Sequence, residues 1–438
     1  MRSSGVGRVA VVALITASLL LGFLASLQVL RLPFLAKESF GQDGEPTMSI
    51  KASIPLEFRA RVEAYKNGDL VFAKDGDPWT LNFAKMIKLV FFTYDRTDWP
   101  DVRPTVVRQP NRLTTITSAI TNLRNDVATT YVPVIGIGNG TAEPSINDVS
   151  LQSTIALFDV LDYRNVTLQD VGGFFWLTIT GSFTGLEATV SEVGLFVRVN
   201  EGGTSPLAPD QAFLLLLARD IVSPPIALAA GDVLTVRYAI RIPKDVLTRY
   251  GFCDLIQFVF GLGDWNLRQV YSCYREYTFF SLVINATGVC TSGFGSSCVT
   301  AVFVTSSITY TNRFGFRGIA SGYTIAMKSP MTTITTNATH LIIRAAIRVE
   351  VPSDSTPTLH GLVLYRGGLR PSSNYDTIVS GLTYTAFTTL LVDVGRADIS
   401  RLYTVPSWTV MFIPFDPPLT VPAGAKVQVT LELAIPIS

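Results

Sequence analysis

Apolar and polar residues alternate over long stretches of the chain after residue 48, and this pattern predicts strands. Every even-numbered residue from Ile50 to Val62 is apolar, whereas Lys51, Glu57 and Arg59 lie on the opposite face. A period of two is typical of a half-buried strand. Pro55 cannot donate a ladder hydrogen bond, so an edge position is favoured. Alternating or short apolar runs predict further strands at 174–179, 192–199, 213–218, 233–242, 279–284, 302–310, 341–351, 359–365 and 427–437.

The stretch that follows the first strand predicts a hairpin and then a short helix. Asn67-Gly68 separates two alternating runs, and both residues tolerate the positive φ of a tight hairpin turn. Residues 82–92 change to a helical period, with Asp77 expected as the helix cap and Pro78 at the first helical position. Asp75 and Asp77 lack the later ligands of a calcium loop, which favours a turn. The expected inner face of the helix is Phe83, Met86, Ile87, Val90 and Phe91.

The second half of the chain repeats landmarks of the first half in the same order. Pro225 and Gly231 recur as Pro418 and Gly424, and both pairs are 193 positions apart. Same-order landmarks indicate two copies of one β-rich unit. The other recurring motifs are Gly136–Gly140 with Gly318–Gly322, and Val193–Phe196 with His360–Val363.

The repeat and the strand pattern together predict an all-β fold. Thr, Val, Ile and aromatic residues dominate both halves, and Gly or Pro interrupts the pattern about every 8 to 15 residues, which is typical of sandwiches and not of βαβ units. We expect two tandem β-sandwich modules, Ig-like or jelly-roll-like, after an N-terminal transmembrane or signal helix. The predicted boundaries are 1–36 (signal peptide or anchor), 37–48 (linker), 49–243 (first module, with the hairpin and helix), 244–298 (insert) and 299–438 (second module).

The N-terminal segment predicts export. Residues 9–30 contain no charge, and Arg2 and Arg8 precede them. About 20 apolar residues span a bilayer as a helix, and flanking arginines keep that end in the cytoplasm. Ala25-Ser26-Leu27 is a poor cleavage site and Ser39-Phe40-Gly41 lies far downstream, so a secretory signal and an uncleaved anchor both remain open. The rest of the chain is expected to be extracellular or on the cell surface.

All four cysteines fall within the predicted insert. Outside the cytoplasm, disulfides are the default state of paired thiols, and four thiols allow three pairings. No Cys-x-x-Cys spacing is present and neither histidine is nearby, so disulfides are favoured over zinc. The disulfide candidates are Cys253, Cys273, Cys290 and Cys298.

Four Asn-x-Thr sequons fit an exported chain. Such sequons mark acceptors of N-linked glycans in surface loops, although a Thr-rich chain contains them by chance as well. The glycosylation candidates are Asn139, Asn165, Asn285 and Asn337.

Composition removes several classes of function. Only 16% of residues are charged and the net charge is +1, so the chain lacks the basic field that nucleic acid binding requires. His340 and His360 are the only histidines, and no zinc-protease or nucleophile-elbow motif is present. We therefore expect no catalytic residues, no metal site and no cofactor.

Three weaker patterns have ordinary explanations. Gly136–Thr141 is glycine-rich but lacks the Lys-Ser/Thr of a phosphate loop and the context of a dinucleotide loop, so a turn is favoured. Asp159 with Asp162, and Asp393 with Asp398, would be glycosidase pairs only if the fold brought them together. Tryptophans in sandwiches are mostly core residues, and an exposed one can stack on sugars. The five are Trp79, Trp99, Trp176, Trp265 and Trp408.

One stretch resembles a known kind of module. Gly136-x-Gly-x-Gly-Thr141 is followed by Ser191–Phe196 and by Ala230–Ile240. Together with Pro144, Asp148 and Leu151, these motifs resemble a β-sandwich module of phage tail-fibre-like proteins and of surface and virion structural proteins of prokaryotes, including archaea. The resemblance covers about a quarter of the chain. It implies a structural or adhesive role without catalytic residues.

The sequence therefore predicts a structural or adhesive surface protein, not an enzyme. Its expected partners are the membrane, through the N-terminal helix, and further copies of itself or other surface proteins. The strand at 49–62 follows a predicted linker and is a candidate for completing a neighbour's sheet in a filament. The alternatives are a virion structural or receptor-binding protein and an extracellular carbohydrate-binding protein.

Overall fold

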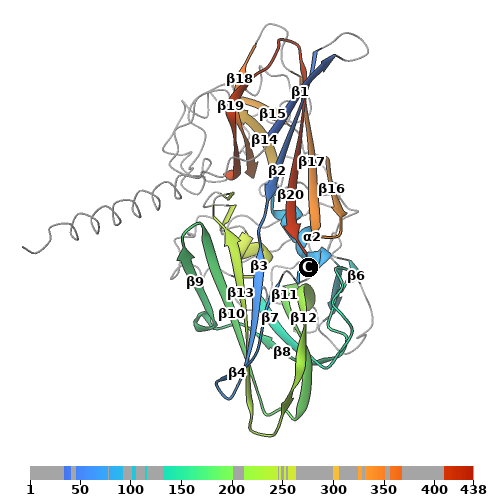
Figure 1. Cartoon of the computed structure of the whole chain (residues 1–438), viewed down its shortest axis with the longest axis vertical. Coiled ribbons are helices and arrows are strands. Elements are labelled where there is room, and N and C mark those ends of the chain that lie inside the picture. The colour runs from blue at the N-terminus through green and yellow to red at the C-terminus, as the bar shows by residue number, and fades with distance from the viewer. Residues whose placement is uncertain are drawn as a thin grey trace, which may run out of the picture. The chain divides into compact units, whose positions relative to one another are not determined.

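The computed structural model describes about half of the chain, and about two thirds of the described residues lie in strands (Figure 1). The all-β prediction is confirmed. One α-helix, α2 (Leu81–Phe91), and two short helical turns, Tyr163–Asn165 and Leu255–Val259, accompany the strands. The described residues are 34–40, 46–76, 78–91, 101–104, 114–115, 132–200, 212–244, 246–247, 251–252, 255–262, 299–304, 324–327, 331–350, 356–366 and 409–437.

The strands of the first repeat form two sheets. Sheet I has the order β4-β3-β13-β10-β9 and sheet II the order β6-β5-β12-β11-β7-β8, and every pairing is antiparallel. Sheet I consists of β3 (Arg59–Lys66), β4 (Asp69–Gly76), β9 (Val166–Val171), β10 (Phe174–Thr184) and β13 (Val233–Pro243). Sheet II consists of β5 (Asp101–Pro104), β6 (Thr114–Thr115), β7 (Val132–Gly138), β8 (Thr154–Asp159), β11 (Ala188–Asn200) and β12 (Ala212–Leu228).

The strands of the second repeat, together with β1 and β2, form two further sheets. Sheet III has the order β1-β2-β20-β17-β16 and sheet IV the order β15-β14-β18-β19. Sheet III consists of β1 (Phe34–Phe40), β2 (Pro46–Pro55), β16 (Met331–Thr336), β17 (His340–Glu350) and β20 (Lys426–Pro436). Sheet IV consists of β14 (Val299–Val304), β15 (Thr324–Met327), β18 (Thr358–Arg366) and β19 (Thr409–Thr420).

The two repeats match strand for strand. β7 to β13 and β14 to β20 occur in the same order and make the same pairings, so that β12-β11-β7-β8 corresponds to β19-β18-β14-β15 and β13-β10-β9 to β20-β17-β16. Pro224 and Pro417 both follow a cis peptide bond, and Gly231 and Gly424 both have positive φ. The landmarks spaced by 193 residues therefore mark equivalent places in two copies of one topology.

Sheets I and II face one another across a hydrophobic core. The inward positions of β10 and β13 are fully buried, and Phe158 of β8 contacts Phe183 of β10 with ring centroids 6.0 Å apart. Gly181 of β10 lies so close to Ile135 of β7 that an added Cβ would be 3.1 Å from its side chain. Burial of a large aliphatic or aromatic side chain contributes about 1.5–3 kcal/mol, so this alternation drives the pairing of the sheets.

The predicted strand at 49–62 divides between the two repeats. Its first part is β2, which pairs in parallel with β20, and its second part is β3, which pairs antiparallel with β13. The break comes after Pro55, which ends β2. This overturns two expectations: residues 37–48 are not a linker, because β1 and β2 form a hairpin there, and residues 49–55 belong to a sheet of the second repeat.

Two of the three residues between β2 and β3, Leu56 and Phe58, are buried and hydrogen-bonded. Leu56 and Phe58 are fully buried, and the Leu56 amide donates to the carbonyl oxygen of Ala434 at the end of β20. The Trp79 indole donates to the carbonyl oxygen of Phe58, and Trp79 stacks on Phe83 of α2 with ring centroids 4.1 Å apart. The short connection is thus fixed to β20 on one side and to the helix on the other.

The hairpin and the helix were predicted correctly, but the helix cap was not. Asn67 and Gly68 have φ of 52° and 94° and turn the chain between β3 and β4. α2 begins at Leu81, three residues after Pro78, and the preceding Thr80 hydroxyl donates to the Leu216 carbonyl oxygen instead of capping the helix. Asp77, the predicted cap, lies outside the described residues. On the helix, Phe83, Met86, Ile87 and Phe91 are fully buried as expected.

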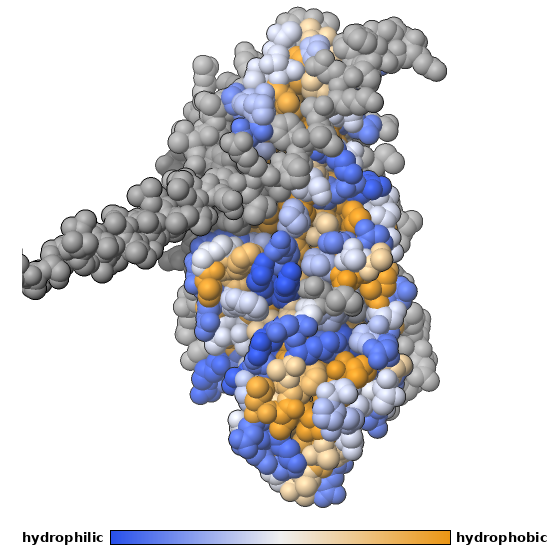
Figure 2. Space-filling model, in the orientation of Figure 1, coloured by the Kyte–Doolittle hydropathy of each residue, from blue (hydrophilic) through white to orange (hydrophobic). Residues whose placement is uncertain are grey.

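β4 is an exposed edge strand. Phe72 is the only residue of β4 that is classed as buried, whereas Leu70 and Val71 are 52% and 40% exposed. Figure 2 shows apolar surface in the part of the molecule where Figure 1 labels β4. An exposed apolar edge strand pairs readily with other chains unless it is anchored or charged.

Several sequence predictions lie outside the described residues. They are the membrane segment 9–30, the four cysteines, the strand at 279–284 and the glycine motif at 318–322. Within the part of the chain that the structure describes, no helix has the length and apolar character needed to cross a bilayer.

Candidate functional site

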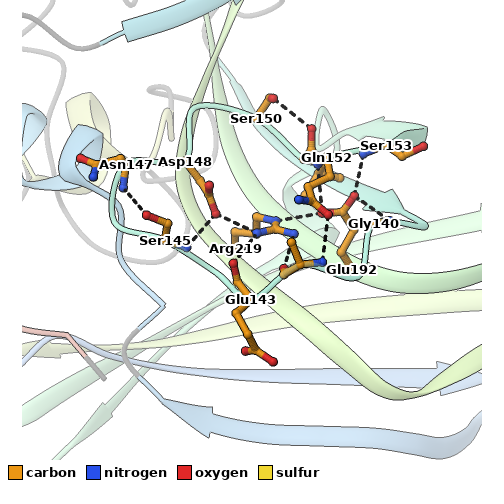
Figure 3. A network of polar contacts seen from close by, with 12 residues as sticks. Gly140, Glu143, Ser145, Asn147, Asp148, Ser150, Gln152, Ser153, Glu192 and Arg219 are labelled. Atoms are coloured by element: carbon orange, nitrogen blue, oxygen red, sulfur yellow. Dashed lines mark hydrogen bonds and ion pairs between the residues drawn. The ribbon is translucent and has the colours of Figure 1, made fainter.

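The glycine motif at the end of β7 encloses a buried carboxylate (Figure 3). Glu192 of β11 is completely buried, and its Oε1 accepts hydrogen bonds from the amides of Gly140 (3.0 Å) and Ser153 (2.8 Å). Its Oε2 accepts from the Gln152 amide at 3.1 Å. The loop between β7 and β8 therefore wraps around a side chain of the neighbouring strand β11.

The close approach of this loop explains two of the glycines. A Cβ on Gly138 would lie 2.6 Å from Glu192 Oε1, and one on Gly140 would lie 2.5 Å from the same atom. Neither distance is possible without displacement, so these positions exclude a side chain. The glycine-rich loop resembles an anion-binding loop because it binds an anion, but that anion is the protein's own Glu192.

Arg219 of β12 completes the network. Its side chain is 1% exposed, its Nε donates to Glu192 Oε2 at 2.8 Å, and its Nη1 donates to Asp148 Oδ2 at 2.8 Å. Its Nη2 donates to the Ala142 carbonyl oxygen at 2.8 Å. One guanidinium thus ties β11 and β12 to both halves of the loop through charge-assisted hydrogen bonds to two different carboxylates.

The Glu192 carboxylate and the Arg219 guanidinium are both stabilised in their charged forms. Burial opposes ionisation of Glu192, but the backbone amides of Ser153 and Gln152 and the Arg219 guanidinium outweigh it and lower the Glu192 pKa. Burial likewise opposes the charge of Arg219, and its two carboxylate partners raise its pKa. Both groups remain charged at neutral pH, and all of their described contacts are internal, so this cluster acts as a structural latch for the 139–153 loop.

A second polar cluster lies between sheets I and II. Lys74 of β4 contacts Asp220 Oδ1 of β12 at 2.9 Å, and Asp220 is 2% exposed. Asp220 Oδ2 and the fully buried hydroxyl of Tyr238 have no hydrogen-bond partner among the described residues. Burial raises the pKa of Asp220 despite Lys74, and burial and then the Asp220 charge raise the pKa of Tyr238.

The carboxylates of Asp159 and Asp162, the candidate pair that lies within the described residues, are each bound to an arginine. Asp159 accepts from Arg198, and Asp162 accepts from Arg164 at 2.9 Å, so each carboxylate has its own arginine. His340 Nδ1 contacts the Thr339 hydroxyl, and His360 lies on a strand of another sheet. Asp393 and Asp398 lie outside the described residues, within which no group of three potential metal ligands occurs.

The three sequons within the described residues differ in the exposure of their asparagines. Asn139 and Asn337 are exposed and Asn165 is half-buried, while Asn285 lies outside the described residues. The Asn337 Oδ1 accepts from the amides of Thr339 and His340, which holds this sequon in an Asx turn at the start of β17.

The described tryptophans differ in environment. Trp79 is a core residue at 1% exposure, and Trp176 is half-buried on the outer face of β10. Trp99, Trp265 and Trp408 lie outside the described residues.

The residues of both polar clusters were missed by the sequence analysis. Glu192 lies in a strand of mostly apolar residues, and Arg219-Asp220 follows directly on the apolar run 213–218. A charge within an apolar strand is a signal for a buried pair, but the partners of these three residues come from distant parts of the chain.

Comparison of the chain with protein-family models, with curated proteins and with solved structures gave no match. The functional proposal therefore depends on the contacts described above.

Proposed function

We propose that this protein is a structural or adhesive protein of the cell surface, built from two tandem β-sandwich modules, whose copies assemble by strand exchange. The observation that carries the proposal is β2. This strand precedes both repeats in the sequence, yet it forms an inner strand of sheet III, between β1 and β20. A strand added from outside a repeat is the element that strand-exchange assemblies pass between subunits.

The contacts of β2 are those of a well-fitted strand. All residues from Thr47 to Pro55 are in register with residues 426–434 of β20. Ile50, Ala52 and Ile54 are fully buried. On the outer face, Lys51 contacts Glu432 at 3.0 Å, and Arg344 of β17 contacts the same carboxylate at 2.8 Å. Sheet III would lose buried apolar area and a charge network without β2.

The same pairing can be made within one chain or between chains. Only residues 56–58 connect β2 to β3, so β2 and sheet I of one chain stay together whichever copy supplies sheet III. If β2 of one copy inserted beside β20 of the next, the contact would be head-to-tail, and such contacts build filaments when they do not close into rings. The export segment 9–30 would place this assembly outside the cytoplasm.

Single-cysteine variants distinguish the two arrangements. Ser49 pairs with Gln428, and partner residues in adjacent strands lie within disulfide range. We would co-express a Ser49→Cys chain with a Gln428→Cys chain and oxidise the assembled cell-surface fraction. A covalent heterodimer, seen on a non-reducing gel, is expected only if β2 crosses between copies.

The double variant Ser49→Cys/Gln428→Cys is the matched control, because it can close within one chain. A disulfide in the double variant without any heterodimer in the mixture rejects strand exchange. Protease treatment of intact cells tests the location separately: an epitope tag at the C-terminus should be removed, and its protection would reject the surface assignment.

A second function, carbohydrate binding, is favoured by one row of residues on the outer face of sheet I. Register places Gln169, Trp176, Arg241 and Arg59 side by side across β9, β10, β13 and β3. The Arg241 guanidinium lies 3.7 Å from the ring centroid of Phe174, and Gln169 and Arg59 are exposed. A half-exposed indole flanked by amide and guanidinium donors suits a sugar ring, with stacking below and hydrogen bonds at its edges.

A glycan array probed with the wild type and with Trp176→Ala tests this second function. Thr178→Ala, on the same face of the same strand, is the control. We expect Trp176→Ala alone to lose the signal; absence of binding by the wild type removes the hypothesis.

A further inference from the structure

Lys74 and Asp220 join the two facing sheets at their margin. Lys74 pairs in register with the buried Val62, so its side chain starts on the inner face of β4. Asp220 lies on β12 of sheet II, and its Oδ1 is 2.9 Å from Lys74 Nζ. The two residues are 146 positions apart in the sequence. Among the described residues, this contact is the side-chain hydrogen bond that holds the exposed edge strand β4 to the opposite sheet.

An ion pair leaves the polar groups around this contact unsatisfied. Asp220 Oδ2 and the Tyr238 hydroxyl are buried without a described partner, and Tyr238, Val62 and Lys74 form one row across β13, β3 and β4. An unsatisfied buried polar group is destabilising, and a buried carboxylate more so. A neutral arrangement of the same atoms avoids the buried charge.

We propose that Lys74 Nζ and Asp220 Cγ are joined by an amide bond in the mature protein. The neutral amine attacks Cγ of the protonated carboxyl group, the N–C bond forms and the C–OH bond breaks. One proton from the nitrogen leaves with the hydroxyl group as water. Nothing is oxidised or reduced, and no co-reactant is needed.

The surroundings favour the neutral form of the carboxyl group. Burial raises the pKa of Asp220, which favours its protonated form. The Lys74 side chain is 45% exposed, so the water that the reaction releases has a path to solvent. The packing of the two strands holds the reacting atoms at contact distance, so the reaction avoids the entropic cost of a bimolecular encounter.

The product would suit a surface protein. The amide would fasten β4 covalently to sheet II, remove the charge from Asp220 and leave a carbonyl oxygen as a hydrogen-bond acceptor in the pocket that contains the Tyr238 hydroxyl. An edge strand fixed in this way is protected against pairing with foreign strands and against peeling under tension.

Peptide mapping of the purified full chain tests the proposal. After denaturation and trypsin digestion, we expect a branched peptide in which residues 67–85, uncleaved at Lys74, are attached to residues 220–237. Its mass should be the sum of the two peptides minus one water. In Lys74→Arg, which keeps the positive charge but lacks the amine, the two peptides should be separate.

Asp220→Ala is the second control and should also abolish the branched peptide. Asp220→Asn is not a suitable control, because an asparagine can form the same amide with loss of ammonia. Linear peptides from the wild type, whether cleaved at Lys74 or not, overturn the proposal, since either result shows a free lysine.

Discussion

The two repeats place opposite chemistry at equivalent positions. In the first repeat, Arg219 lies opposite Gly194 and forms an ion pair with Glu192. In the second, the residue 193 positions after Arg219 is Phe412, which lies opposite Val363, and Gly361 occupies the place of Glu192. Glu192 and Gly361 are both buried. One topology therefore accepts either a buried ion pair or uncharged residues at this point.

The difference extends to the neighbouring strand. Gly138 pairs with Glu192 in the first repeat, whereas Val304 pairs with Gly361, at the place of Glu192, in the second. Gly138 cannot carry a side chain because a Cβ there would lie 2.6 Å from Glu192 Oε1, and without that carboxylate the equivalent strand carries a branched side chain. A buried ion pair is weak evidence for stability as such; here it fixes the path of the 139–153 loop.

The repeats also differ in how their first sheet is completed. β13 has β3 as its antiparallel neighbour, while β20 has β2 in parallel, and a three-residue connection joins β2 to β3. The second repeat thus depends on a segment that lies more than 200 residues before it in the sequence. The predictions below test these contrasts.

Disruption of β2 should have the largest effect. Ile50→Asp places a carboxylate at a fully buried position of β2, and the lost burial and the unpaired charge together should cost at least about 5 kcal/mol. Chemical denaturation followed by tryptophan fluorescence measures this. Lys51→Gln, on the exposed face of the same strand, should change the free energy of unfolding by about 1 kcal/mol or less; equal effects of the two variants would show that β2 is not an inner strand.

Loss of the Glu192 charge should have the second-largest effect on the free energy of unfolding. Glu192→Gln leaves the Arg219 guanidinium buried without its main counter-charge, which should cost about 3–5 kcal/mol. The control is Glu57→Gln, which removes the half-exposed partner of Arg241 and should cost about 0–1 kcal/mol. Glu192→Leu combined with Arg219→Met replaces the ion pair with apolar side chains and should recover much of the stability; no recovery would mean that the loop requires the charge itself.

Crowding at the glycine loop should have a smaller effect. Gly140→Ala puts a Cβ 2.5 Å from Glu192 Oε1, and the displacement should cost about 1–3 kcal/mol. Thr141→Ala, at the exposed neighbouring position, is the control. Because the cost arises from Glu192, it should shrink in the Glu192→Leu/Arg219→Met background, and a double-mutant cycle measures this coupling; strictly additive effects would contradict the assigned contact.

Low pH should remove the contribution of the ionised Glu192 side chain to the free energy of unfolding. The folded-state pKa of Glu192 is lowered, so the folded protein binds this proton less readily than the unfolded chain, where the pKa is about 4.3. The resulting stability is present above pH about 4.3 and is lost as the pH falls through the folded-state value. Denaturation at pH 7, 5, 4 and 3 should show the gap between wild type and Glu192→Gln narrowing below about pH 4; a constant gap would contradict the lowered pKa.

The sequence predicts the local structure of this protein well and its long-range contacts poorly. The alternation in residues 49–62 correctly indicates strands with one buried face, but nothing local shows that the strand breaks at Pro55 and that its two parts join different sheets. Glu192 and Arg219-Asp220 are visible as charges in apolar runs, but their partners are set by strand order. The Gly136–Thr141 motif was correctly separated from phosphate loops, whereas its ligand, a carboxylate 52 residues from Gly140, was not foreseen.

The central claim is that β2 is an integral strand of sheet III, supplied from outside the second repeat. Hydrogen–deuterium exchange of the native protein, read at peptides covering residues 46–55 and 426–436, tests it most directly. The account predicts that the amides of β2 exchange as slowly as those of β20, and that Ile50→Asp accelerates both. Rapid exchange over residues 46–55, with β20 still protected, would contradict it.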